Sequence, residues 1–129
     1  MDPTNQALEL EVDRLAEEGA RAMTDDRGLS LLRFAEAHAI ALRIGARHKA
    51  ATLSCLMARA WSREAGAERP RMSQALRFAR RAVGEDPTES ARNTLAAMCE
   101  LAARRDDRPT KARRNAVLRG IAVSLRGEA

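Results

Sequence analysis

Residues 71–87 read RMSQALRFARRAVGEDP, and this stretch is the clearest guide to the fold. The apolar side chains in it recur every three or four residues, at Met72, Ala75, Leu76, Ala79, Ala82 and Val83. This spacing places one apolar stripe along an α-helix. We therefore predict a helix over residues 71–83 that ends at Gly84. With the proline that follows, the helix defines the pattern Ala75-x3-Ala79-x2-Ala82-x4-Pro87.

Similar patterns recur along the chain. The same spacing of small and apolar residues occurs 38 residues earlier, as Ala37-x3-Ala41-x2-Ile44. A second pattern has a large apolar residue, an alanine, two residues and then a packing residue, as in Leu15-Ala16-x2-Gly19, Met57-Ala58-x2-Trp61 and Leu95-Ala96-x2-Cys99. Internal repetition with a period of 20–50 residues is typical of helical repeat proteins.

Turn and capping residues divide the chain into six predicted helices. We expect them from Asp2-Pro3 to Met23, over 29–44, over 48–65, over 71–83, from the N-cap Asp86 with Pro87 at the first position, and from the N-cap Thr110 to Leu125. Gly45 and Gly66 follow the second and third helices. The prediction is an all-α fold, a single domain over 1–129 built from antiparallel hairpins at about 3–45, 48–84 and 87–126. An irregular helical bundle is the alternative.

The composition agrees with this fold class. Alanine occurs 27 times, valine and isoleucine together only 7 times, and tyrosine never, which disfavours a β-sandwich or barrel. No apolar run approaches the roughly 18 residues that span a bilayer, so we expect no membrane segment. The first five residues lack the features of a signal peptide, and Cys55 and Cys99 lie in no CxxC pair. We therefore expect a cytoplasmic protein whose cysteines are small buried side chains.

Charge is unevenly distributed along the chain. Residues 1–26 carry eight acidic and two basic side chains, whereas residues 27–129 carry ten acidic and twenty-one basic ones. An acidic start and a basic end favour either intramolecular complementarity or an anionic partner. A merely solvated, arginine-rich surface is the other interpretation.

Residues 48–87 resemble the tetratricopeptide repeat family, and residues 1–47 and 88–129 do so less closely. In that family the first helix of each hairpin, helix A, has the pattern large apolar, small, x, x, aromatic, as in Met57-Ala58-x2-Trp61. The second helix, helix B, has the small-residue spacing quoted above for residues 75–87. This chain departs from the family in its longer loop after the third helix, in Ala79 where an aromatic is usual, and in a period of 38–42 rather than about 34 residues.

The resemblance implies an array of helical hairpins, right-handed as in the family, with a groove lined by the first, third and fifth helices. Carried over position by position, the groove residues are Asp13, Glu17, Arg21, Thr52, Arg59, Arg63, Asn93 and Glu100. Arg59 and Arg63 are four residues apart and would share one side of a helix. Two guanidinium groups side by side suit a carboxylate or an acidic peptide. An equally good interpretation is that the side chains of Arg59 and Arg63 are simply exposed to solvent. The terminal helices are expected to act as caps with polar outer faces.

No catalytic or metal-binding motif is present. The two histidines, His38 and His48, have no acidic residues or cysteines at ligand spacing, and no glycine-rich phosphate loop occurs. We therefore predict no enzymatic activity, no cofactor and no metal. Trp61, the only tryptophan, is interpreted either as a core residue or as an exposed binding hot spot.

The leading functional prediction is a non-enzymatic interaction module that binds a peptide or helix of another protein. Small proteins that resemble this family often act as adaptors or as dedicated chaperones, including those of bacterial secretion systems. The alternative is nucleic-acid binding through the basic region 104–126, with contacts from Arg104, Arg105, Arg108, Lys111, Arg113 and Arg114. A structural homo-oligomer is a third possibility, and the sequence does not predict the oligomeric state.

Overall fold

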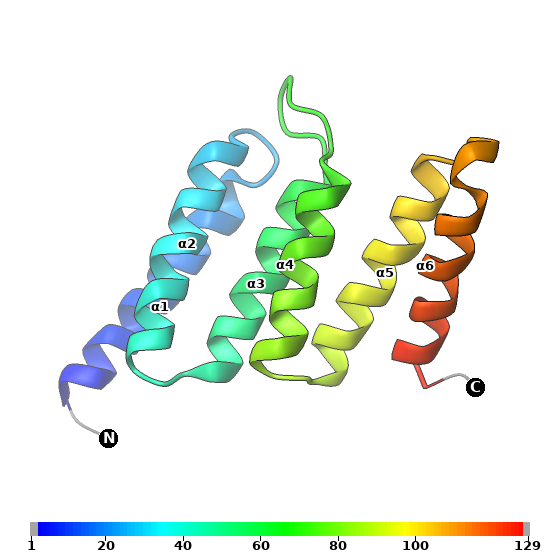
Figure 1. Cartoon of the computed structure of the whole chain (residues 1–129). Coiled ribbons are helices and arrows are strands. Elements are labelled where there is room, and N and C mark those ends of the chain that lie inside the picture. The colour runs from blue at the N-terminus through cyan, green and yellow to red at the C-terminus, as the bar shows by residue number, and fades with distance from the viewer. Residues whose placement is uncertain (1–2, 128–129) are drawn as a thin grey trace.

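The computed structural model describes residues 3–127 and places six α-helices within them. Their bounds are α1 Pro3–Ala22, α2 Arg27–Arg43, α3 Arg47–Ser62, α4 Met72–Glu85, α5 Glu89–Arg105 and α6 Ala112–Leu125, with a short 3-10 turn, η1 Pro109–Lys111, before α6. The prediction of an all-α fold with six helices is confirmed. Helices α1 and α2, α3 and α4, and α5 and α6 pack in pairs, and the pairs follow one another in a row (Figure 1).

Adjacent pairs are joined by specific helix contacts. Helix α2 packs on α3, and α5 packs on both α4 and α3. Helix α2 ends in a Schellman motif, in which Gly45 has a φ of +70° and the Ala46 N–H donates to the Ala41 carbonyl at 2.9 Å. This compact turn sends α3 back beside α2.

The fourth helix extends beyond its predicted end. Gly84 lies inside α4, which continues to Glu85, and Asp86 adopts an extended conformation as the C-cap. Steric conflict with the proline ring moves the residue before a proline out of the helical region, so Pro87 rather than Gly84 ends this helix.

Other predicted helix boundaries also differ from the observed ones. The N-cap of α5 is Thr88, whose Oγ1 accepts from the Ala91 N–H at 3.1 Å, and not Asp86. Thr110 lies within the 3-10 turn η1 instead of capping α6, and α2 starts at Arg27 because Asp26 accepts from the Leu29 N–H. Helix α3 ends at Ser62, three residues early. The predicted cap Asp2 lies outside the described residues.

Alanine and glycine allow the helices to approach closely. In the first two hairpins Phe34 is fully buried together with Val12, Leu15 and Leu53. A Cβ atom on Gly19 would lie only 2.7 Å from the Phe34 ring, so α1 can pack this close only with glycine there. Around α5 and α6 the core consists largely of alanines with Leu95, Met98, Cys99 and Leu118.

The outer face of α6 differs from the expected polar cap. Leu118 and Ala122 are buried against the rest of the molecule, whereas Val117 is 57% exposed and Ile121 and Val123 are also exposed. The prediction of a polar outer face was therefore wrong for α6, because its apolar residues are distributed around the helix and the α5–α6 contact covers only one side.

Candidate functional site

Two grooves lie on different sides of helix α3. The α3–α5 groove is lined by Thr52, Cys55, Leu56 and Arg59 of α3 and by Ser90 and Asn93 of α5. The α2–α4 groove is lined by Leu31 of α2, Met57 and Trp61 of α3, Phe78 and Arg81 of α4, and Arg71 of the loop before α4. The two grooves differ in chemistry, and each is described in turn.

The α3–α5 groove brings together three of the predicted binding residues. Arg59 borders both of its hollows, Thr52 lines the smaller one of about 120 Å³, and Asn93 lines the larger, open one of about 460 Å³. All three side chains are exposed, and Arg59 forms no ion pair with any residue in 3–127. Glu89 lines the larger hollow as well, so the groove presents both charges and an amide.

The other five predicted groove residues lie elsewhere. Asp13 accepts from Lys49 Nζ at 2.7 Å, and Glu17 pairs with Arg21 along α1. The Glu100 carboxylate pairs with Arg126, at the C-cap of α6. Arg63 is the C-cap of α3 with an extended backbone, φ −104° and ψ 157°, so its expected helical alignment with Arg59 was wrong.

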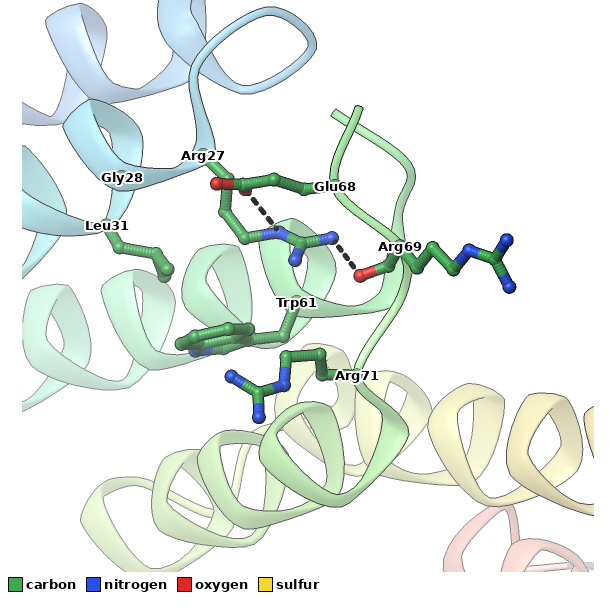
Figure 2. Close-up of a pocket in the computed structure, with 7 residues that line it drawn as sticks. All are labelled: Arg27, Gly28, Leu31, Trp61, Glu68, Arg69 and Arg71. Carbon is green, nitrogen blue, oxygen red and sulfur yellow. Dashed lines mark hydrogen bonds and ion pairs between the residues drawn. The ribbon is translucent and has the colours of Figure 1, made fainter. Parts of the chain in front are cut away.

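Trp61 forms the floor of the α2–α4 groove and is only half-buried. The guanidinium groups of Arg27 and Arg71 lie 5.4 and 5.8 Å from the centre of its ring, on opposite sides of it (Figure 2). The indole N–H is buried without a hydrogen-bond acceptor in the part of the chain that the structure describes. Trp61 therefore packs partly against the core and partly lines the groove.

Arg27 holds the rim of this groove in place and is itself 4% exposed. Its guanidinium group donates to the carbonyls of Ala60 at 3.2 Å, Arg69 at 2.8 Å and Arg63, and lies 3.6 Å from the Glu68 carboxylate. These carbonyls belong to the last turn of α3 and the loop after it, where helical partners are missing. Arg27 was not among the predicted site residues, and its only signal in the sequence was the unusually long loop, whose carbonyls the arginine binds.

That loop has a defined conformation. Ala65 and Glu68 exchange two backbone hydrogen bonds, and the Gly66 N–H donates to the Thr24 carbonyl between α1 and α2. The Arg71 N–H donates to the Trp61 carbonyl at 2.7 Å. The loop therefore fixes Arg71 beside the tryptophan instead of leaving it free.

A polar network closes the other end of the α2–α4 groove. The buried His38 donates from Nε2 to Glu85 Oε2 at 2.5 Å, the Ser54 hydroxyl donates to Glu85 Oε1 at 2.5 Å, and Arg81 Nε donates to Ser54 Oγ at 2.9 Å. In a catalytic triad the imidazole lies between the hydroxyl and the carboxylate. Here the carboxylate lies between them, so the His38 imidazole does not contact the Ser54 hydroxyl, and the network joins α2, α3 and α4.

The remaining reactive groups are shielded or separated. Burial raises the pKa of the Cys55 and Cys99 thiols above the usual value, which keeps them in the neutral form. His48 lies 3.2 Å from Asp86, at the surface. Among residues 3–127, no group of three or more His, Cys, Asp or Glu side chains is arranged to hold a metal ion.

The cationic side chains of the basic region 104–126 differ in whether they have partners within the chain, which their sequence does not indicate. Arg108 donates twice to Asp106 and holds the pKa of that carboxyl down at about 2. Arg114 donates to the Ala102 carbonyl and to the buried Asn115. The other four candidate contacts, Arg104, Arg105, Lys111 and Arg113, form no ion pair with any described side chain.

No helix in the described part of the chain has the length and apolar character needed to cross a membrane. No family model, no curated protein and no solved structure matches this chain.

Proposed function

We propose that the chain is a non-enzymatic, tetratricopeptide-like interaction module that binds a peptide or helix of a partner protein in the α3–α5 groove. The observation that supports this most directly is the convergence of Thr52, Arg59 and Asn93 on one open groove from two separate helices. Polar side chains on rigid helices can hold a ligand with little loss of conformational entropy.

The exposed groups indicate the kind of ligand. Arg59 offers an unpaired guanidinium fork, which binds a carboxylate with two parallel hydrogen bonds. Asn93 has both an amide donor and an acceptor, which suit the peptide backbone. Glu89 at the edge of the groove would repel a uniformly acidic ligand. We therefore expect a segment with one carboxylate beside Arg59 and an amine or N–H group beside Glu89.

A pull-down with matched variants tests this function. The wild-type chain and Arg63→Glu should capture the same discrete protein from nuclease-treated native lysate, because Arg63 lies outside the groove. Arg59→Glu combined with Asn93→Ala should lose this protein while keeping the wild-type circular dichroism spectrum. Equal capture by all three chains would contradict the proposal.

Nucleic-acid binding is the second candidate, and the four unpaired cations Arg104, Arg105, Lys111 and Arg113 favour it. Phosphate contacts would make the affinity fall steeply with salt concentration. Fluorescence anisotropy with a labelled 20-base-pair DNA duplex measures this directly. Arg104→Glu combined with Arg113→Glu should abolish the binding, whereas Arg108→Glu should have a smaller effect because Asp106 already neutralises Arg108.

A further inference from the structure

We propose that the α2–α4 groove is a second protein-binding site, which takes an acidic segment carrying one large apolar side chain. This site is separate from the proposed α3–α5 groove, and it rests on different residues. Three features support it: an apolar floor, a rim of unpaired positive charge, and a frame that holds both in position.

The floor offers a place for an apolar anchor. A hollow of about 240 Å³ is lined mainly by Leu31, Met57, Trp61 and Phe78. It continues into an open hollow of about 430 Å³, because Leu31 and Trp61 line both. Large apolar side chains inserted into such a pocket provide much of the affinity of protein interfaces, and tryptophan and arginine are the residues most enriched at their energetic centres.

The rim selects for negative charge. Arg71 and Arg69 are exposed and form no ion pair with any side chain in 3–127, whereas Glu68 is the one carboxylate that lines the open hollow. The Arg71 guanidinium lies beside the indole ring, and the Arg69 side chain extends outward from the loop (Figure 2). Arg81 is already engaged by Ser54 and Glu85. A segment with carboxylates on either side of its apolar anchor therefore complements the groove.

The frame keeps the site formed before the ligand arrives. Arg27 is fixed by three backbone carbonyls, and Arg71 is held by its backbone bond to Trp61. Groups that are already positioned lose less freedom on binding, so each contact contributes more to affinity.

Selection from a phage-displayed library of random 12-residue peptides, with the intact chain as the target, tests the ligand class. We expect enrichment of peptides in which Asp or Glu flanks a single Leu, Ile, Met or Phe. A failure to enrich any peptide, or enrichment of basic peptides, would overturn the inference.

The affinity of an enriched synthetic peptide then tests the location. Trp61 is the only tryptophan, so its fluorescence reports directly on this groove. Arg71→Glu combined with Arg69→Glu should weaken binding at least about tenfold, the effect of reversing charges at an interface. The control Arg59→Glu, in the α3–α5 groove, should change the dissociation constant less than about twofold, because rim charges away from the contact matter little.

Two outcomes separate this inference from the proposed function. Loss of peptide binding in Arg59→Glu, with retention in the Arg69 and Arg71 variant, would overturn the inference and support the α3–α5 groove. Sedimentation of the chain without peptide tests the other occupant. A dimer that dissociates on Arg71→Glu would assign the groove to a second copy and would also overturn the inference. Circular dichroism and urea unfolding check that each variant is folded.

Discussion

The two grooves beside α3 differ in how they are built. In the α3–α5 groove, exposed polar side chains project from two helices that pack directly on each other. In the α2–α4 groove, a half-buried tryptophan lies under a loop that a buried arginine holds in place. The first groove needs only regular helices, whereas the second also depends on contacts between distant parts of the chain.

This difference makes the two grooves separable by experiment. Residues 27 and 69 are far apart in sequence, and their hydrogen bond is one of several that organise the α2–α4 groove. None of these bonds contributes to the α3–α5 groove. Substitutions in the arginine–loop contact should therefore alter one groove and leave the other intact.

Arg27→Met should have the largest effect. Methionine fills part of the space but leaves the carbonyls of Ala60, Arg63 and Arg69 without their donor, at an expected cost of about 2–4 kcal/mol in the free energy of unfolding. Urea denaturation followed by circular dichroism measures the loss. The control Arg33→Met removes an arginine from the same helix that forms only surface ion pairs, and should cost less than about 1 kcal/mol. Equal losses would show that Arg27 does not organise the loop.

Gly19→Ala should have the next largest effect on the free energy of unfolding. Gly19 packs against Phe34 of α2, the helix that forms one side of the α2–α4 groove. The added methyl group would meet the buried Phe34 ring at 2.7 Å, and the resulting strain should outweigh the roughly 1 kcal/mol gain in helix propensity. We expect a net loss of about 1–2 kcal/mol in urea unfolding. Gly84→Ala is the matched control in α4: nothing lies within 4 Å of its Cβ position, so it should stabilise the chain. A stabilising Gly19→Ala would contradict the close packing of α1 on α2.

Trp61→Phe should change stability by less than about 1 kcal/mol, because removing the unpaired indole N–H offsets part of the lost ring contact. The same substitution should weaken binding of the acidic peptide in the α2–α4 groove, measured by anisotropy of the labelled peptide. A loss of about 3 kcal/mol or more, the cost of emptying a core aromatic site, would instead identify Trp61 as a core residue.

The smallest effect concerns the cysteines, of which Cys55 borders the α3–α5 groove. Because burial raises the pKa of both thiols, the native chain should react with iodoacetamide more slowly than free cysteine at pH 8. The rate should increase as the pH rises, since more thiolate forms. A ligand in the α3–α5 groove should slow Cys55 further and leave Cys99 unchanged, which Cys55→Ser and Cys99→Ser chains can distinguish. Rapid labelling at neutral pH would contradict the burial of both side chains.

Local sequence patterns were sufficient to predict the number and order of the helices. Helical periodicity, glycines and prolines act over a few residues, and they indicate six helices before any packing is known. Errors in the placement of the helices themselves concerned only their ends, as at Gly84, where the conformational restriction imposed by Pro87 determined the boundary. Thr52 and Arg59 were expected at one groove only through the family resemblance, and both line the α3–α5 groove.

The burial of individual arginines, in contrast, depends on contacts between segments that are far apart in the sequence. The sequence has twenty-one arginines, and the fold buries Arg27 against the carbonyls at the end of α3. Arg63 follows Arg59 at helical spacing, but α3 ends at Ser62, so the two side chains do not align. At this helix end the Arg63 carbonyl accepts a hydrogen bond from Arg27. Trp61 borders a groove because the packing of α2, α3 and α4 leaves it only half-buried. The burial of a side chain and the lack of an ion-pair partner both depend on segments distant in sequence, so a local sequence pattern does not predict them.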